Sequence, residues 1–133
     1  FVLPGVTAQR ENVLAPNEII THVTLGAASP RSATYIVRSK EANDWPVGLA
    51  AVSLQIENGA CTGARVCLGA VAPTPWRVPA AEAALQGKPV TEETAAAAAD
   101  AAIAGATPLS QNGYKVATAR AAVRRAILSA AAR

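Results

Sequence analysis

The alternation of apolar and polar side chains predicts strands in the first half of the chain. Residues 19–25 alternate with the two-residue period of a strand, and residues 33–38 are rich in β-branched and aromatic side chains. A hairpin is predicted further along, because two alternating runs meet at Asn58-Gly59, a dipeptide that supplies the positive φ angles of a tight turn. We therefore expect an antiparallel sheet of three to four strands.

Beyond residue 78 the pattern predicts about three helices. An Ala-rich helix over residues 79–86 ends at Gly87, and a second helix begins after Thr91 as its N-cap and ends at Gly105. The third helix runs from about residue 116 towards the C-terminus. Its apolar stripe has helical spacing and consists of Val116, Ala119, Val123, Ile127 and Ala130. The predicted fold class is α+β, with residues 1–133 forming a single domain.

Composition supports one compact core. The 133 residues are 51% hydrophobic but only 4% aromatic, so we expect close packing through alanine and valine. No apolar run approaches the ~20 residues that span a bilayer, which predicts a soluble domain. The sequence opens on Phe1 and contains no methionine. We therefore expect it to be part of a longer polypeptide.

The residues that usually perform catalysis or bind metals are scarce. Cys61 and Cys67 lie six residues apart in one predicted strand, a separation of ~20 Å that excludes a disulfide between them. We expect free, mostly buried thiols, which suit a reducing cytoplasm. His22 is the one histidine, and it falls in a predicted strand. No Cys-x-x-Cys pair, Gly-x-Ser-x-Gly, Gly-x-Gly-x-x-Gly or phosphate-binding P-loop occurs, so no catalytic, metal or nucleotide-phosphate site is predicted within this chain.

Positive charge gathers at the C-terminal end. From Tyr114 onward the chain has no acidic residue, and its cations are Lys115, Arg120, Arg124, Arg125 and Arg133. Binding to an anionic polymer is one interpretation of this run, and it predicts salt-sensitive retention on heparin or DNA. The net charge of only +3 and the frequency of cations near helix C-termini favour a structural interpretation.

A dense polar segment covers residues 38–45, between two predicted strands. Loops held by a rigid scaffold often carry function, so this segment is a candidate for facing a ligand. A solvated loop with local ion pairs is the alternative that pattern alone favours.

Five segments together resemble one family. They are Asn17-Glu18-Ile19-Ile20-Thr21, residues 35–45, Gly69 to Arg77, Asn112-Gly113-Tyr114-Lys115 and Val123-Arg124-Arg125-Ala126. In this order and spacing they resemble the C-terminal domain of the FAD-binding (medium) subunit of molybdenum hydroxylases, the family of xanthine dehydrogenase and carbon monoxide dehydrogenase. The resemblance implies an N-terminal domain that holds most of the FAD, with this domain closing over the flavin ring.

The resemblance also implies partners and residues. Molybdopterin would be carried by a large subunit and iron–sulfur clusters by a small subunit, in a cytoplasmic complex that passes electrons through FAD to an acceptor. Many relatives have a lysine near the flavin where this chain has Ile36, which implies an apolar neighbour of the ring; a core strand residue is the alternative. Asn43 and Asp44 fall where relatives place polar groups beside the flavin.

A rival hypothesis for the whole chain is a non-catalytic module for subunit assembly, without cofactor contact. It would act through the Ala-rich helices or the basic last helix. Neighbouring genes for an iron–sulfur subunit and a molybdopterin subunit would distinguish the flavoprotein hypothesis from this one.

Overall fold

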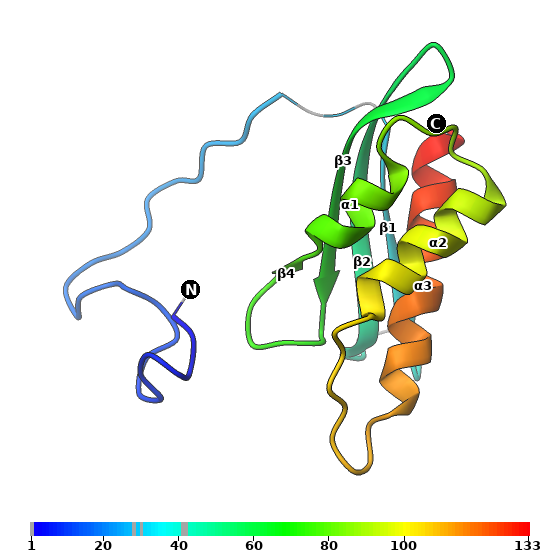
Figure 1. The fold of residues 1–133 in the computed structure, drawn as a ribbon. Helices are drawn as coiled ribbons and strands as arrows, with labels where there is room; N and C mark the ends of the chain where they lie inside the picture. The colour runs from blue at the N-terminus through cyan, green and yellow to red at the C-terminus, as the bar shows by residue number, and fades with distance from the viewer. Residues whose placement is uncertain (1, 28, 30, 41–42) are drawn as a thin grey trace.

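The computed structural model of the protein describes residues 2–27, 29, 31–40 and 43–133. Within them, one antiparallel sheet with the order β1-β2-β3-β4 is followed by three helices, which confirms the α+β prediction (Figure 1). The strands are β1 (Arg31–Arg38), β2 (Pro46–Glu57), β3 (Ala60–Gly69) and β4 (Trp76–Arg77). The helices are α1 (Pro79–Leu85), α2 (Glu92–Ile103) and α3 (Tyr114–Ala131).

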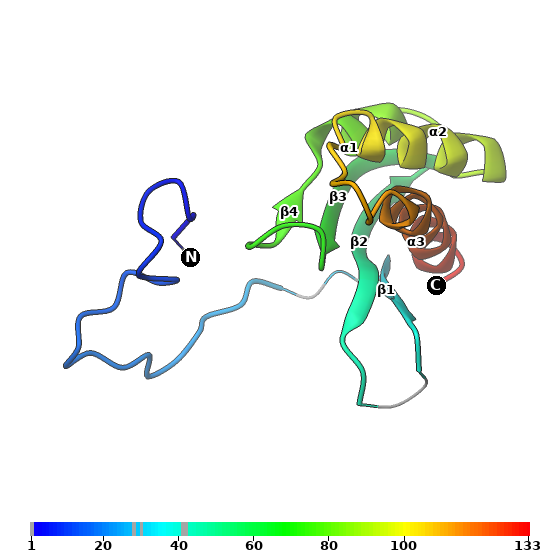
Figure 2. The same cartoon turned by 90° about the horizontal axis from the view of Figure 1, so that it is seen from below.

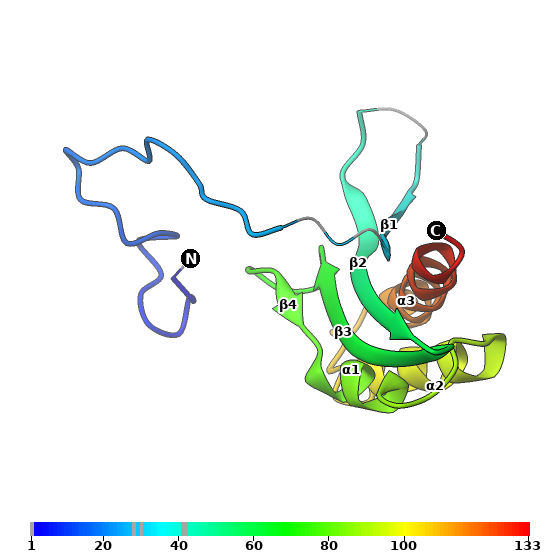
Figure 3. The ribbon, with the colours of Figure 1, turned by 90° about the horizontal axis from the view of Figure 1, so that it is seen from above.

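The predicted hairpin joins β2 to β3. Asn58 and Gly59 have φ angles of 51° and 81°, the left-handed values that the dipeptide was expected to supply. The register of the two strands shifts between Gln55 and Ile56, next to this turn. Such an irregularity increases the local twist of a strand pair, and Figures 2 and 3 show the sheet curling between β1 and β4.

Helices α1 and α3 pack on one face of the sheet, and α2 packs against both of these helices. Val52 and Leu54 of β2 and Val66 of β3 point into this layer and are almost fully buried, as are Val123 and Ile127 of α3. The side chains that alternate with them point to the opposite face, which none of the described helices covers (Figures 2 and 3). The sheet therefore has a core face and an open face.

Small side chains dominate the core, as the composition predicts. Of the nineteen buried hydrophobic residues in the described part of the chain, ten are alanines and none is aromatic. Both α2 and α3 carry buried alanines, and α2 packs between α1 and α3 while α3 also packs on β1 and β2. Thr91 caps α2 as predicted, because its hydroxyl accepts a hydrogen bond from the Thr94 N–H while the Thr94 hydroxyl bonds the Thr91 N–H.

The predicted strand over residues 19–25 is wrong. This stretch is irregular and makes no backbone hydrogen bond with any described residue, and Ile19 and Leu25 are 82% and 83% exposed. Alternating side chains form a strand only when a neighbouring strand pairs with the backbone N–H and C=O groups. Here the segment runs away from the sheet (Figure 1). The fourth strand is β4 instead, and it lies within the proline-rich bend after β3.

Candidate functional site at the β1–β2 end of the sheet

The structure brings the three predicted site residues to one end of the sheet. Ile36 lies near the end of β1, and Asn43 and Asp44 lie in the loop that leads into β2. Glu41 and Ala42, which belong to the same predicted polar segment, lie outside the described residues. All three residues therefore belong to the β1–β2 end of the sheet, one on a strand and two on the loop.

Local hydrogen bonding shapes the loop. The Asp44 carboxylate accepts a hydrogen bond from the Lys40 N–H at 3.1 Å, which ties the two sides of the loop together. Asn43 has a φ of 54°, a left-handed conformation that asparagine tolerates better than most residues. Its side chain is exposed, whereas that of Asp44 is half-buried. The loop therefore presents an amide and a carboxylate at defined positions.

Ile36 points to the open face of the sheet. It is 39% exposed, so it is not part of the helix-covered core. The register aligns Ile36 with Leu49 of β2 and Leu49 with Gly69 of β3. A Cβ atom at Gly69 would lie 2.8 Å from Leu49 Cγ, so the glycine makes room for the leucine side chain. The result is a continuous apolar row across the open face.

Trp45 is a residue that the sequence reasoning did not single out. It follows Asp44 directly, and its side chain is 90% exposed. A large aromatic side chain left this open to water is informative, because burial of an indole is strongly favourable. The aromatic type was visible in the sequence, but its exposure depends on the loop conformation.

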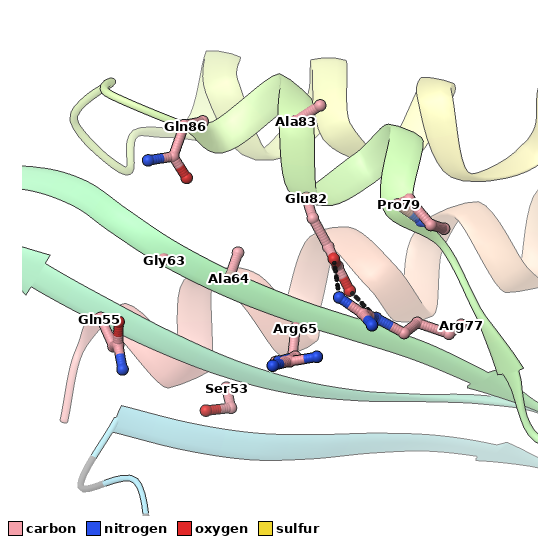
Figure 4. Close-up of a pocket in the computed structure, with 10 residues that line it drawn as sticks. All are labelled: Ser53, Gln55, Gly63, Ala64, Arg65, Arg77, Pro79, Glu82, Ala83 and Gln86. Atoms are coloured by element: carbon pink, nitrogen blue, oxygen red, sulfur yellow. Dashed lines mark hydrogen bonds and ion pairs between the residues drawn. The ribbon is translucent and has the colours of Figure 1, made fainter.

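A polar hollow of about 650 Å³ lies between the open face and α1 (Figure 4). Arg77 donates to both carboxylate oxygens of Glu82, at 2.9 and 2.7 Å, and the Val66 N–H donates to the same carboxylate at 3.0 Å. The hydrogen bond from Arg77 is the main reason that the pKa of Glu82 lies below its usual value. Glu82 thus stays ionised and paired, which does not suit a general acid.

The two cysteines and the histidine lie on other segments than the β1–β2 loop. Cys61 and Cys67 are both free and lie in β3, as predicted, and burial raises the pKa of the Cys61 thiol. His22 is exposed in the irregular N-terminal segment, where its ring bonds the Thr21 hydroxyl, so the expected strand environment is wrong. No group of three or more possible metal ligands occurs among the described residues.

The basic run of α3 is largely engaged with the protein itself. Arg120 pairs with Asp100 and Arg124 with Glu92, so both tie α3 to α2. The hydrogen bond from Arg120 lowers the pKa of Asp100. Part of the positive charge at the C-terminal end therefore holds α3 against α2. This agrees with the structural interpretation of the basic run. Within the part of the chain that the structure describes, no helix is long and apolar enough to cross a membrane.

The fold matches part of a solved carbon monoxide dehydrogenase chain. Over 80% of this chain and 39% of the matched chain, it superimposes with a TM-score of 0.72 and 38% identity on a structure of carbon monoxide dehydrogenase from Hydrogenophaga pseudoflava lacking the Mo-pyranopterin moiety of its cofactor. The medium chain of that organism's carbon monoxide dehydrogenase is 32% identical over 150 aligned positions, covering 100% of this chain and 52% of the relative. The FAD-binding subunit PaoB of Escherichia coli aldehyde oxidoreductase is 33% identical over 118 positions, covering 88% of this chain and 34% of that subunit.

The family assignment follows from a domain-level match. Residues 33–130 match the model of the carbon monoxide dehydrogenase flavoprotein C-terminal domain, so the chain belongs to this family. The resemblance carried by the five sequence segments is thereby confirmed. The chain spans about a third to a half of the length of the relatives it matches.

Proposed function

We propose that this chain is the C-terminal domain of the FAD-binding subunit of a molybdenum hydroxylase, and that it covers the flavin ring. The observation that carries the proposal is the family match over residues 33–130. The similarity to PaoB, which is named as an FAD-binding subunit, supports the same assignment. When bound, FAD supplies the electron transfer from iron–sulfur clusters to an acceptor, while the protein positions the cofactor and tunes its electronics.

The residues at the β1–β2 end fit a planar ring with polar edges. Ile36 offers an apolar contact on the open face, and the exposed indole of Trp45 offers a flat surface suited to aromatic stacking. The Asn43 amide can donate and accept hydrogen bonds, and the Asp44 carboxylate can accept them. We assign these side chains to orienting the ring and excluding water from it, whereas the phosphates of FAD are held by an N-terminal domain of the same subunit.

Family membership also supports the proposed partners. A large subunit with molybdopterin and a small subunit with iron–sulfur clusters would complete an oxidoreductase complex in the cytoplasm. In that complex this domain would have no catalytic residue of its own, because the redox steps belong to the cofactors. The substrate is then chosen at the molybdenum centre of the large subunit.

Flavin titration tests whether tight FAD binding requires the rest of the subunit. We expect the complete subunit to bind FAD and the 133-residue chain to bind it weakly or not at all, because the chain contains none of the glycine-rich motifs that cradle phosphates. Quenching of flavin fluorescence measures both affinities. Tight binding by the 133-residue chain would contradict this expectation.

A triple variant tests contact with the flavin. If the flavin spectrum of the complete subunit is unchanged by Asn43→Ala, Asp44→Ala and Trp45→Ala together, the domain serves assembly without cofactor contact.

A further inference from the structure

Two of the family-like segments meet in a cleft that the flavin proposal does not use. The connection from β3 through β4 into α1 supplies one wall, and the end of α2 with the start of α3 supplies the other. The cleft has a volume of about 570 Å³, within the roughly 300–1,000 Å³ of small-molecule sites. Many of its lining residues come from the β3–β4 and α2–α3 connections, which lie at the same end of the domain in Figure 1.

The walls of the cleft are apolar. Val71, Pro73 and Trp76 line the first wall, which follows β3. Ile103 and Val116 line the second wall, at the end of α2 and the start of α3. Trp76 remains 54% exposed, so a large aromatic surface borders the cleft and is open to water. A ligand with an apolar body would bury this surface, which is favourable by about 25 cal/mol for each Å² removed from water.

Lys115 and Asn112 supply hydrogen-bond donors at the cleft. Lys115 Nζ donates to the Ala70 carbonyl at 2.7 Å, and an ammonium group has two further N–H donors. Asn112 uses its side-chain oxygen to accept from the Leu109 N–H, which leaves its NH₂ group as a donor. None of the described residues that line the cleft is acidic. The chemistry therefore favours an anionic group on the ligand.

The backbone beside Lys115 is held in an unfavourable conformation. Ala70 has a φ of 62°, in the left-handed region that costs a residue with a Cβ atom roughly 1–2 kcal/mol. The bond from Lys115 to the carbonyl of this residue fixes the lysine at the cleft. Strained backbone of this kind clusters at functional sites.

We propose that this cleft binds a small carboxylate with an aryl or alkyl body. The apolar body lies between Trp76 and Val116, and the carboxylate accepts hydrogen bonds from Lys115 Nζ. The volume limits the ligand to a small molecule, and the Lys115 ammonium, with no acidic residue among the described lining residues, selects a carboxylate over a neutral or cationic head.

Tryptophan fluorescence of the 133-residue chain tests the proposal. Trp45→Phe leaves Trp76 as the single tryptophan reporter, since the chain contains two. We expect 3-phenylpropionate to give a saturable change of Trp76 emission, and the neutral 3-phenylpropionamide to bind at least about tenfold more weakly, because a hydrogen bond to a charged group is stronger than one to a neutral group. No saturable change, or equal affinity for acid and amide, overturns the proposal.

Two variants tie the affinity to the cleft. In the same background, Lys115→Gln should weaken the acid about tenfold and leave the amide unchanged, whereas Lys88→Gln, the same change away from the cleft, should alter neither. Val71→Asp places a carboxylate at the exposed rim and should repel the acid, with Val71→Asn as its neutral control. Thermal melts establish that each variant is folded. If Lys115→Gln lowers the melting temperature, the Val71 pair decides: equal acid affinity in the two variants contradicts the proposal.

Discussion

The guanidinium of Arg125 lies 5.1 Å from the centre of the Tyr35 ring, which places a cation of α3 over an aromatic side chain of β1. The same guanidinium donates a hydrogen bond to the Tyr35 hydroxyl. Successive side chains of a strand point to opposite faces, so Tyr35 faces α3 while Ile36 faces the open side. The contact therefore anchors, from the helix side, the strand that presents Ile36.

A double-mutant cycle should measure this anchor. Arg125→Ala and Tyr35→Leu are each expected to lower the free energy of unfolding, with a coupling of about 0.5–1 kcal/mol from the cation–π contact at this partly exposed position. Urea denaturation of the wild type, both single variants and the double variant gives the coupling. Strictly additive effects would mean that the contact contributes no stability.

Glu82→Gln should reduce the sensitivity of the fold to acid. The pKa of Glu82 in the folded chain lies below the ordinary value of 4.5, mainly because of its hydrogen bond from Arg77. Its contribution is therefore fully present above pH 4.5 and lost as the pH falls through the folded-state pKa. Unfolding free energies measured from neutral to acidic pH should fall less steeply for Glu82→Gln than for wild type. Glu57→Gln, at the exposed hairpin end, removes a carboxylate that makes no ion pair among the described residues and is the matched control; equal slopes for the two variants would contradict the role of Arg77.

Ala122→Leu should destabilise the domain through overpacking. Ala122 is fully buried in the layer of small side chains, and added methyl groups in a filled core cost about 1–3 kcal/mol. Ala121→Leu, one residue earlier on the exposed side of α3, should change the free energy of unfolding by less than about 0.5 kcal/mol. Equal effects of the two substitutions in chemical denaturation would contradict close packing at Ala122.

Asp44→Ala in the complete subunit should change flavin reduction or reoxidation without preventing assembly. The substitution removes a carboxylate from the proposed flavin-facing loop, together with its hydrogen bond from the Lys40 N–H. The rate of flavin reduction or reoxidation, followed by stopped-flow absorbance, is expected to change several-fold. Glu57→Ala, at the opposite end of β2, should leave these rates as they are. Wild-type potential and turnover in Asp44→Ala would make Asp44 an ordinary loop residue.

Ile36→Lys in the complete subunit should raise the flavin reduction potential. A positive charge near the ring stabilises its more negative, reduced form, and about 1.4 kcal/mol of such stabilisation corresponds to roughly 30 mV for two electrons. Ile36 is partly exposed, so the lysine can reach water and the fold should tolerate it. Thr34→Lys, one step back on the same face, should give a smaller shift in a spectroelectrochemical titration. An unchanged potential in Ile36→Lys would place the ring elsewhere.

Much of the fold could be predicted because local chemistry decides it. Asn58-Gly59 specifies the hairpin through its backbone preferences, and Thr91 specifies the start of α2 through its hydroxyl. The small strand β4 has only two residues, too few for periodicity to reveal. Residues 19–25 have the right periodicity but lack a neighbour, and pairing between strands is a long-range property.

The site was accessible to sequence reasoning only in part. The polar segment between two strands marked the β1–β2 loop, but the exposure of Trp45 follows from the loop conformation. The cleft could not be predicted, because Ala70 and Lys115 are 45 positions apart and meet through packing of the helices on the sheet.

The buried core begins at Ala33 and ends at Ala130, the two residues that also bound the family match. Residues 2–27 contribute no buried residue to it. The packed interior and the family resemblance therefore coincide, so the family's shared sequence corresponds to one continuous core.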